Sequence, residues 1–248
     1  MMPSPLAALS AAVGSLLDRS RRHFETSRSR SGAVAVGLVL LVTLATVGGI
    51  VGLGAAFDAT IDREVTVDNP DRPSETTCES FGDDSLIGEQ CDRPERIDVD
   101  VGEELRRATG DYVAYGLFGV PIWWGIFALA LHGGARLAGG DGSVGDSFVI
   151  AAWALVPEIL RLAAGLAAVW YALSTATVGG ETIRAIANEI VAAIGTMQVP
   201  LIVASALVIA VQWVIVVGGL EAAHDLDRGT AGAVAGAFAV LGFLLAAV

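Results

Sequence analysis

The sequence predicts an all-α membrane protein with five transmembrane helices, a cytoplasmic amphipathic N-terminal helix and an acidic external loop. Three observations support this prediction. The 248-residue chain is 54% hydrophobic, with a mean hydropathy of +0.63. Its apolar residues form long runs, whereas a soluble fold interrupts such runs every few residues. Its charged residues gather between the runs.

Five apolar runs approach or exceed the roughly 20 residues that a helix needs to cross a ~30 Å hydrocarbon core. They are Ala33–Phe57, Tyr112–Leu131, Phe148–Leu173, Val191–Leu220 and Thr230–Val248. The net charge of −12 argues against a nucleic-acid partner. All 15 basic residues are arginine, and an acidic chain without lysine fits a salt-adapted (halophilic) source. A high-GC coding sequence is the alternative explanation.

Residues 1–32 form a leader before the first run. Five arginines against two acidic residues give it a charge of +3. This excess places the N-terminus in the cytoplasm and, after five crossings of the cell membrane, Val248 outside. Apolar residues at helical spacing predict a helix on the inner membrane surface, the alternative being a weakly ordered tail. The arginines are Arg19, Arg21, Arg22, Arg28 and Arg30, and the apolar residues are Leu6, Leu9, Val13, Leu16, Leu17 and Phe24.

The first run, residues 33–57, is too long for the apolar part of a cleaved signal peptide, so we expect a retained anchor. The external segment 58–111 follows, and 17 acidic residues against six arginines give it a charge of −11. Cys78 and Cys91 are the only cysteines of the chain, and an oxidising exterior favours a disulfide between them. Two free thiols are the alternative, and without a third ligand the pair makes a poor metal site.

A short helix over Gly102–Thr109 is predicted to lead into the second run, because Glu103/Arg106 and Glu104/Arg107 have i,i+3 spacing. Tyr112 and Tyr115 then suit a position at headgroup depth. The pair Trp123–Trp124 lies deeper, where helix packing is the expected role. His132 ends this run, and a glycine-rich exit loop follows it.

The third run contains Pro157, Glu158 and Arg161 near its middle, where charge is expensive. Spacing of i,i+3 lets Glu158 and Arg161 pair on one helix face. Pro157 deprives the carbonyl of Trp153 of its usual donor and predicts a kink. One reading is a substrate or proton path at a kinked helix, and the other is an ion pair that fixes helix packing. The fourth run adds only Gln198, Pro200 and Gln212 as further candidates.

A cytoplasmic corner is predicted where the loops after the second and fourth runs meet. His132 and His224 approach each other there beside carboxylates such as Glu221, a conceivable metal or pH-sensing site. Solvated helix ends are the alternative, and Asp227 suits the cap of the fifth helix. Within that helix Gly232 and Gly236 are in GxxxG register, which permits close contact within the chain or between protomers. Neither a P-loop nor a nucleophile elbow is present.

Two stretches together resemble the Yip1 family of five-span membrane proteins. Residues 128–160 (ALALHGGARLAGGDGSVGDSFVIAAWALVPEIL) resemble its hairpin of span, glycine loop and span, with His132, Gly139–Gly140 and Pro157 at matching places. Residues 216–236 (VVGGLEAAHDLDRGTAGAVAG) resemble its link into the last span. The resemblance covers the C-terminal half, and it implies that residues 112–248 form a Yip1-like bundle of helices 2–5. Eukaryotic members are associated with small-GTPase partners and vesicle traffic, whereas this chain has only a short leader and carries an acidic insertion.

The sequence therefore predicts a non-enzymatic membrane scaffold or trafficking-like protein without a cofactor, whose partners are the lipid bilayer and other proteins or further copies of itself. The alternative is a small permease or transporter component that uses the charged third run. A membrane-embedded enzyme is a third possibility that no motif supports.

Overall fold

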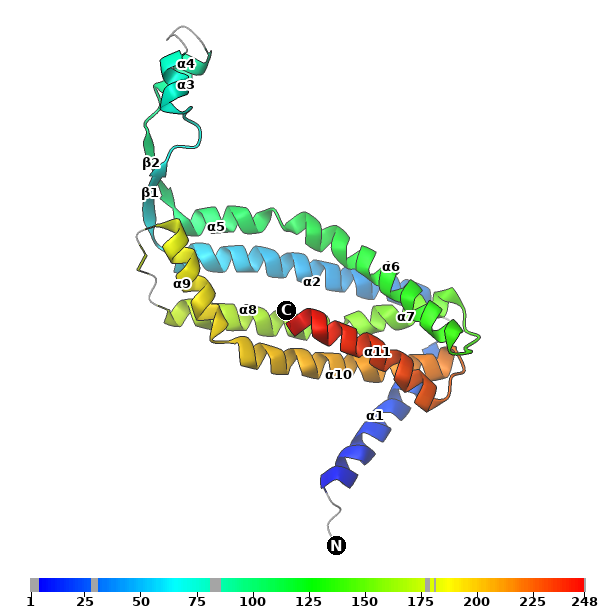
Figure 1. Ribbon diagram of the computed structural model, residues 1–248. Coiled ribbons are helices and arrows are strands. Elements are labelled where there is room, and N and C mark those ends of the chain that lie inside the picture. The colour runs from blue at the N-terminus through cyan, green and yellow to red at the C-terminus, as the bar shows by residue number, and fades with distance from the viewer. Residues whose placement is uncertain (1–4, 28–30, 81–85, 177–178, 181, 248) are drawn as a thin grey trace.

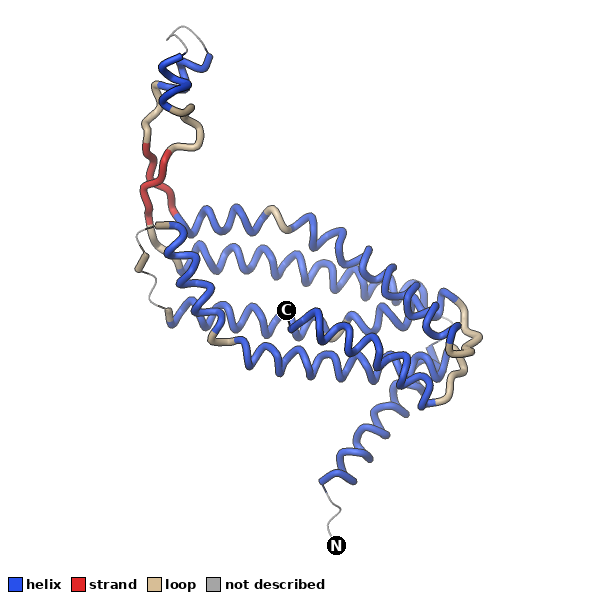
Figure 2. Tube along the Cα trace, viewed as in Figure 1, coloured by secondary structure: helices blue, strands red, loops and turns tan. Residues whose placement is uncertain are grey.

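The computed structural model describes residues 5–27, 31–80, 86–176, 179–180 and 182–247. Within them, long helices lie side by side in a bundle (Figure 1), so the chain is an all-α membrane protein. A two-stranded sheet with two short helices projects from one end of the bundle, and helix α1 leaves the opposite end (Figure 2). We call these two ends the hairpin end and the α1 end.

Four stretches of the described chain are long and apolar enough to cross a membrane: Gly32–Thr60, Val101–Leu137, Val144–Thr175 and Gln198–Ala223. Arg228–Leu244 forms a shorter apolar helix. These helices identify a membrane protein, and the five crossings stay a prediction.

Helix α1 (Pro5–Ser27) packs on α10 through one apolar face. Leu17 and Phe24 of that face are buried, while Leu16 is half exposed. The side chains of Leu6 and Leu9, and residues Arg28 and Arg30, lie outside the described part of the chain. Helix α2 (Ser31–Thr60) follows. It is apolar around its whole circumference, as expected of a helix surrounded by lipid and other helices.

The acidic segment contains a β-hairpin that the sequence analysis did not predict. Strands β1 (Glu64–Asp68) and β2 (Arg96–Asp100) pair antiparallel, with Glu64 opposite Asp100. Both strands alternate polar and apolar residues, the period of a half-buried strand. Helices α3 (Glu75–Ser80) and α4 (Leu86–Cys91) lie between the strands in sequence.

Helix α5 (Val101–Gly110) packs along the last turns of α2, and α6 (Val113–Leu137) continues the same layer (Figure 1). Asp100 caps α5 by accepting from the backbone N–H of Glu103 at 2.9 Å. The prediction that His132 ends the second run is wrong, because α6 continues to Leu137 and its glycines are helical. One reason is packing: Gly134 lies against Val234 of α11, where a Cβ would come within 3.2 Å.

The third and fourth apolar runs are each divided between two helices. The third comprises α7 (Val144–Leu155) and α8 (Glu158–Thr175), with Pro157 at the break. The fourth begins in α9 (Ile183–Gly195) and continues in α10 (Gln198–Ala223), so it is not the single helix that its composition suggested. Pro200 occupies the first turn of α10, where its missing N–H is tolerated and where an uninterrupted helix from α9 is disfavoured.

Helix α11 (Arg228–Ala247) packs on α10. Asp227 caps it by accepting from the backbone N–H groups of Gly229 and Thr230 at 2.9 and 3.1 Å. The GxxxG glycines of α11 face Trp213 of α10 within the same chain. The Trp213 Nε1 atom donates to the Gly232 carbonyl at 3.2 Å, and a Cβ on Gly232 would lie 3.5 Å from the indole ring. These glycines thus make an internal contact.

Separate apolar clusters stabilise the two ends. At the α1 end, α6, α7 and α10 bury Leu131, Ile150, Val217 and Leu220 against α1. At the hairpin end, Ile186 and Ile190 of α9 pack on Leu173 and on Ile61 beside the β-hairpin. The polar groups described next lie at the α1 end and halfway along the bundle.

Candidate functional site

Three polar side chains meet midway along the bundle, where α8 faces α10. The Arg161 Nη2 atom lies 2.6 Å from Glu158 Oε2, and Gln212 Nε2 donates to Glu158 Oε1 at 2.7 Å. We call these three residues the mid-span cluster. Glu158 and Arg161 lie close to the midpoint of Val144–Thr175. A lone ion is costly at that depth, so the opposite charge and the amide donor stabilise the carboxylate together.

Gln212 also satisfies the backbone at the break between α7 and α8. Pro157 has no N–H to donate, and the Trp153 carbonyl instead accepts from the N–H of Val156 at 3.2 Å. The Ala154 carbonyl accepts from Gln212 Nε2 at 2.9 Å. Because hydrocarbon offers no hydrogen bonds, a side chain from a neighbouring helix is the expected partner for such a carbonyl. The mid-span cluster therefore joins α7, α8 and α10 at the kink.

A cleft of about 880 Å³ opens beside the mid-span cluster. Helices α2, α5, α6, α7, α8, α10 and α11 form its walls, and all three residues of the cluster contribute to the lining. The other lining residues are mainly apolar or aromatic, and include Tyr112, Tyr115, Trp123, Phe127, Trp213 and Phe238. Glu158 and Arg161 thus face an open volume as well as each other.

A second polar group lies at the α1 end, and we call it the histidine corner: His132, Ser147 and His224. His224 is fully buried, and its Nε2 atom is 2.9 Å from Ser147 Oγ. Ser147 Oγ lies 3.5 Å from His132 Nδ1, and the two imidazole centroids are 5.9 Å apart. The serine hydroxyl therefore lies between the two histidines.

The glycine loop between α6 and α7 closes over His224. A Cβ on Gly142 would lie 2.6 Å from His224 Nδ1 and 2.4 Å from the Ala223 carbonyl, so only glycine fits there. The backbone N–H of Asp141 donates to the His224 carbonyl at 3.2 Å. Burial lowers the pKa of the His224 imidazole below its ordinary value of 6.5, and the charge on His132 lowers it further. The neutral form of His224 is thereby favoured.

Glu221 does not join the two histidines. Its side chain is 5% exposed and its Oε1 atom accepts from Arg228 Nε at 2.9 Å. The Nη2 atom of the same guanidinium lies 2.7 Å from Asp18 Oδ1 of α1. The hydrogen bond from Arg228 lowers the pKa of the Asp18 carboxyl below 3.8. Arg228 thus joins α1, α10 and α11 at one point, which we call the arginine link (Asp18, Glu221 and Arg228).

The glycine pair Gly218–Gly219 lets two helices approach α10 closely. A Cβ on Gly218 would lie 2.4 Å from Ser20 Oγ of α1, and one on Gly219 would lie 2.6 Å from Ile150 Cγ1 of α7. His23 of α1 also packs edge-on against Trp153 of α7, with ring centroids 4.6 Å apart. The N-terminal helix is therefore an integral part of the α1 end.

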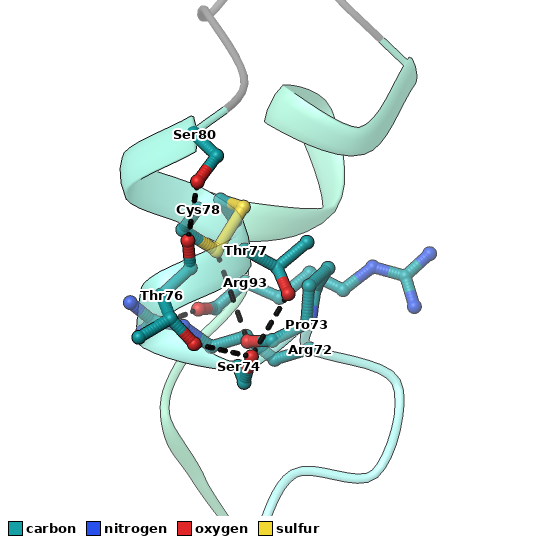
Figure 3. The surroundings of a disulfide bond; sticks show 9 residues. Arg72, Pro73, Ser74, Thr76, Thr77, Cys78, Ser80 and Arg93 are labelled. Atoms are coloured by element: carbon teal, nitrogen blue, oxygen red, sulfur yellow. Dashed lines mark hydrogen bonds between the residues drawn. A yellow bond between two sulfur atoms is a disulfide. The ribbon is translucent and has the colours of Figure 1, made fainter.

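The two cysteines of the acidic segment are bonded to each other between α3 and α4 (Figure 3). Local hydrogen bonds surround the disulfide. Ser74 Oγ lies within 3.1 Å of the hydroxyls of Thr76 and Thr77, and Arg72 Nη1 donates to the Arg93 carbonyl at 3.1 Å. This region lies at the far tip of the hairpin end, away from both polar groups of the bundle (Figure 1).

The structure brings some of the predicted site residues together and separates others. Glu158 and Arg161 are paired, and His132 approaches His224, but Glu221 points to Arg228 instead. Within the described chain, no group of three or more His, Cys, Asp or Glu residues is placed to hold a metal ion. Sequence reasoning missed Ser147 and Asp18. Their partners are 77 and 210 residues away, so no local signal could have revealed them.

Comparison with known families gives one match, to the Yip1 domain, over residues 13–248. No curated protein and no solved structure matches the chain. The match is wider than the resemblance noted from the sequence, which covered the C-terminal half. The matched range includes most of α1 and the whole acidic segment. From the apolar helices and this match over nearly its full length, the chain is an integral membrane protein that belongs to the Yip1 domain family.

Proposed function

We propose that this protein is a non-enzymatic scaffold of the cell membrane that presents α1 as a fixed platform on the cytoplasmic side. The single observation that carries the proposal is the docking of α1 on the bundle. The close approach at Gly218 and the arginine link fix one face of α1. A helix that served only to set topology would need no such contacts.

The exposed face of α1 suggests what the platform contacts. Arg19, Arg21 and Arg22 are exposed there, and Leu16 is half exposed. Arginines at the cytoplasmic surface are attracted to anionic headgroups, and the same charges suit an acidic surface on a protein partner. The N-terminus is then cytoplasmic, and the β-hairpin and the C-terminus are external.

The proposed scaffold has no catalytic role for its buried polar groups. Ser147 and His224 of the histidine corner are buried, and the serine hydroxyl lies between the two imidazoles, so the hydroxyl is engaged on both sides. Glu221 is engaged by Arg228. A general acid or base must lie within hydrogen-bond distance of a bound substrate. The histidine corner and Glu221 instead bond to other helices, which favours a role in holding the helices together.

The test is quantitative cross-linking in native membranes with the full-length protein. We compare wild type with the double variant Arg19→Gln/Arg22→Gln, and with the control Arg107→Gln, which changes an exposed arginine at the hairpin end. Partners of the platform should be lost from the double variant and retained by the control. Partner sets that are identical in all three proteins would contradict the proposal.

A second candidate function is a small permease that uses Pro157, Glu158 and Arg161. The specific observation in its favour is that Glu158 and Arg161 line the cleft. Reconstituted Glu158→Gln, Arg161→Leu and double variants separate the two functions. A solute flux in wild type that all three variants lose would establish the permease and exclude the scaffold. Single variants that misfold, with a double variant that folds and acts like wild type, would exclude the permease.

A further inference from the structure

The cleft beside the mid-span cluster is elongated along α5 and α6. Near the α1 end, α6 and α11 touch, with Phe127 packed edge-on against Phe238 at a centroid distance of 5.5 Å. Toward the hairpin end, the lining continues along α6 and past Tyr112 to Leu105 of α5. From Tyr112 to Phe127 a helix rises about 22 Å. A volume of about 880 Å³ lies within the range of small-molecule sites.

The mid-span cluster, which lines this cleft, has hydrogen-bond donors to spare. Both oxygens of Glu158 are engaged, one by Arg161 and the other by Gln212. Among the described residues, Arg161 pairs only with Glu158 through Nη2, although a guanidinium carries five N–H donors. The Arg161 side chain is 40% exposed. Arg161 can therefore donate to a further acceptor, and guanidinium geometry suits the oxygens of a phosphate.

The walls of the cleft suit a hydrocarbon chain. Gly119 and Gly242 contribute to the lining, and the aromatic residues named above contribute six further side chains. A Cβ on Gly119 would meet nothing within 4 Å, so open space lies directly beside that residue. A polar solute would leave these apolar walls without a partner. A ligand with a polar head and an apolar chain satisfies both surfaces.

We propose that this cleft binds a membrane amphiphile whose phosphate head pairs with Arg161 and whose alkyl chain lies along α6 beside Gly119. The spare donors of Arg161 beside mainly apolar walls support this occupant over a second protein chain, because an amphiphile satisfies both surfaces at once. The inference does not depend on the scaffold role of α1, since the two sites share no residue.

The experiment measures binding to the full-length protein in a maltoside detergent by native mass spectrometry. The probe is oleoyl lysophosphatidic acid. Monoolein is the matched probe that has the same chain without the phosphate, and inorganic phosphate is the matched probe without the chain. We expect one bound lysophosphatidic acid per protein, with monoolein bound about 10- to 100-fold more weakly, as charge-assisted hydrogen bonds imply. Inorganic phosphate should not displace the lipid.

Two variants test the two ends of the ligand separately. Glu158→Gln/Arg161→Leu removes the guanidinium without leaving a lone charge, and should weaken binding of lysophosphatidic acid 10- to 100-fold. Gly119→Leu fills the cleft and should also weaken binding. Its control is Gly125→Leu, on the same helix but outside the lining, where a Cβ again meets nothing within 4 Å. Arg107→Leu is the control for loss of an arginine.

Three results would overturn the proposal. Equal affinity for lysophosphatidic acid and monoolein would show that Arg161 does not bind the phosphate. Displacement of the lipid by inorganic phosphate would identify a site for free phosphate. Unchanged binding by Gly119→Leu, in a protein with wild-type circular dichroism, would place the lipid outside the cleft. If the double variant does not fold, the comparison of Gly119→Leu with Gly125→Leu still decides.

Discussion

Replacing Gly218 with alanine tests whether the close approach of α1 to α10 holds the N-terminal helix on the bundle. The new Cβ would lie 2.4 Å from Ser20 Oγ and 2.7 Å from the backbone nitrogen of Arg21. The Ser20 hydroxyl can rotate away, but the nitrogen of Arg21 moves only if α1 moves. The substitution must therefore shift α1 outward or release it.

Two opposing effects determine how much docking free energy α1 loses in Gly218→Ala. Overpacking of this kind costs about 1–3 kcal/mol. Alanine stabilises a helix relative to glycine by roughly 0.5–1 kcal/mol, which strengthens α10 but not its contact with α1. The clash is the larger effect. Because 1.4 kcal/mol corresponds to a factor of ten, we expect the docked population of α1 to fall about 5- to 150-fold relative to the undocked one.

Limited trypsin digestion measures this population, because α1 contains Arg19, Arg21 and Arg22. When opening is fast, the cleavage rate follows the fraction of open molecules. Gly218→Ala should be cleaved in α1 at least fivefold faster than wild type. Gly14→Ala is the matched control on α1, where a Cβ meets nothing within 4 Å. Equal cleavage of the two variants would refute the role assigned to the Gly218 contact.

Three further predictions concern the polar groups and the disulfide. Gln212→Leu leaves the Ala154 carbonyl and one Glu158 oxygen without a donor, so it should destabilise the bundle by about 1–3 kcal/mol in thermal unfolding. The control Gln198→Leu changes an exposed position and should leave the stability unchanged. The pKa of His224 is lower in the folded than in the unfolded protein, so its contribution to stability is present above pH 6.5 and is lost as the pH falls toward the folded pKa. The Tm should therefore fall between pH 7.5 and 5.5, and His224→Asn should reduce that slope. Equal slopes for the two proteins would contradict the reasoning. The Cys78→Ser/Cys91→Ser double variant should destabilise only the tip of the hairpin end, by roughly 3 kcal/mol in the chain-entropy model, and should speed hydrogen exchange there. A lower Tm of the bundle in that variant would contradict the separation of the two regions.

Composition and periodicity predicted what depends on local chemistry. Long apolar runs identify membrane helices, because each residue contributes to burial in lipid wherever its neighbours lie. The i,i+3 spacing of Glu158 and Arg161 indicated a pair, because the geometry of one helix determines that contact. The family resemblance also came from continuous stretches of sequence, although the match proved to extend to residue 13.

Element boundaries were less predictable where packing overrides composition. His132 looked like the end of a span, yet α6 continues to Leu137, with Gly134 packed on α11. The apolar run Val191–Leu220 looked like one helix, yet α9 packs separately on the hairpin-end core. Composition is the same in either case, so only the contacts between helices decide.

By itself, the sequence determined that this protein lies in a membrane, that its helices are apolar, and which ions lie midway along them. The tertiary structure alone decided which distant groups meet. Asp18 reaches Arg228 across 210 residues, Ser147 reaches His224 across 77, and Gln212 reaches the broken helix at Ala154 across 58. The physical reason is that hydropathy is a property of single residues and short windows, whereas a hydrogen bond between helices depends on their rotation and register, which the packing of the whole bundle determines.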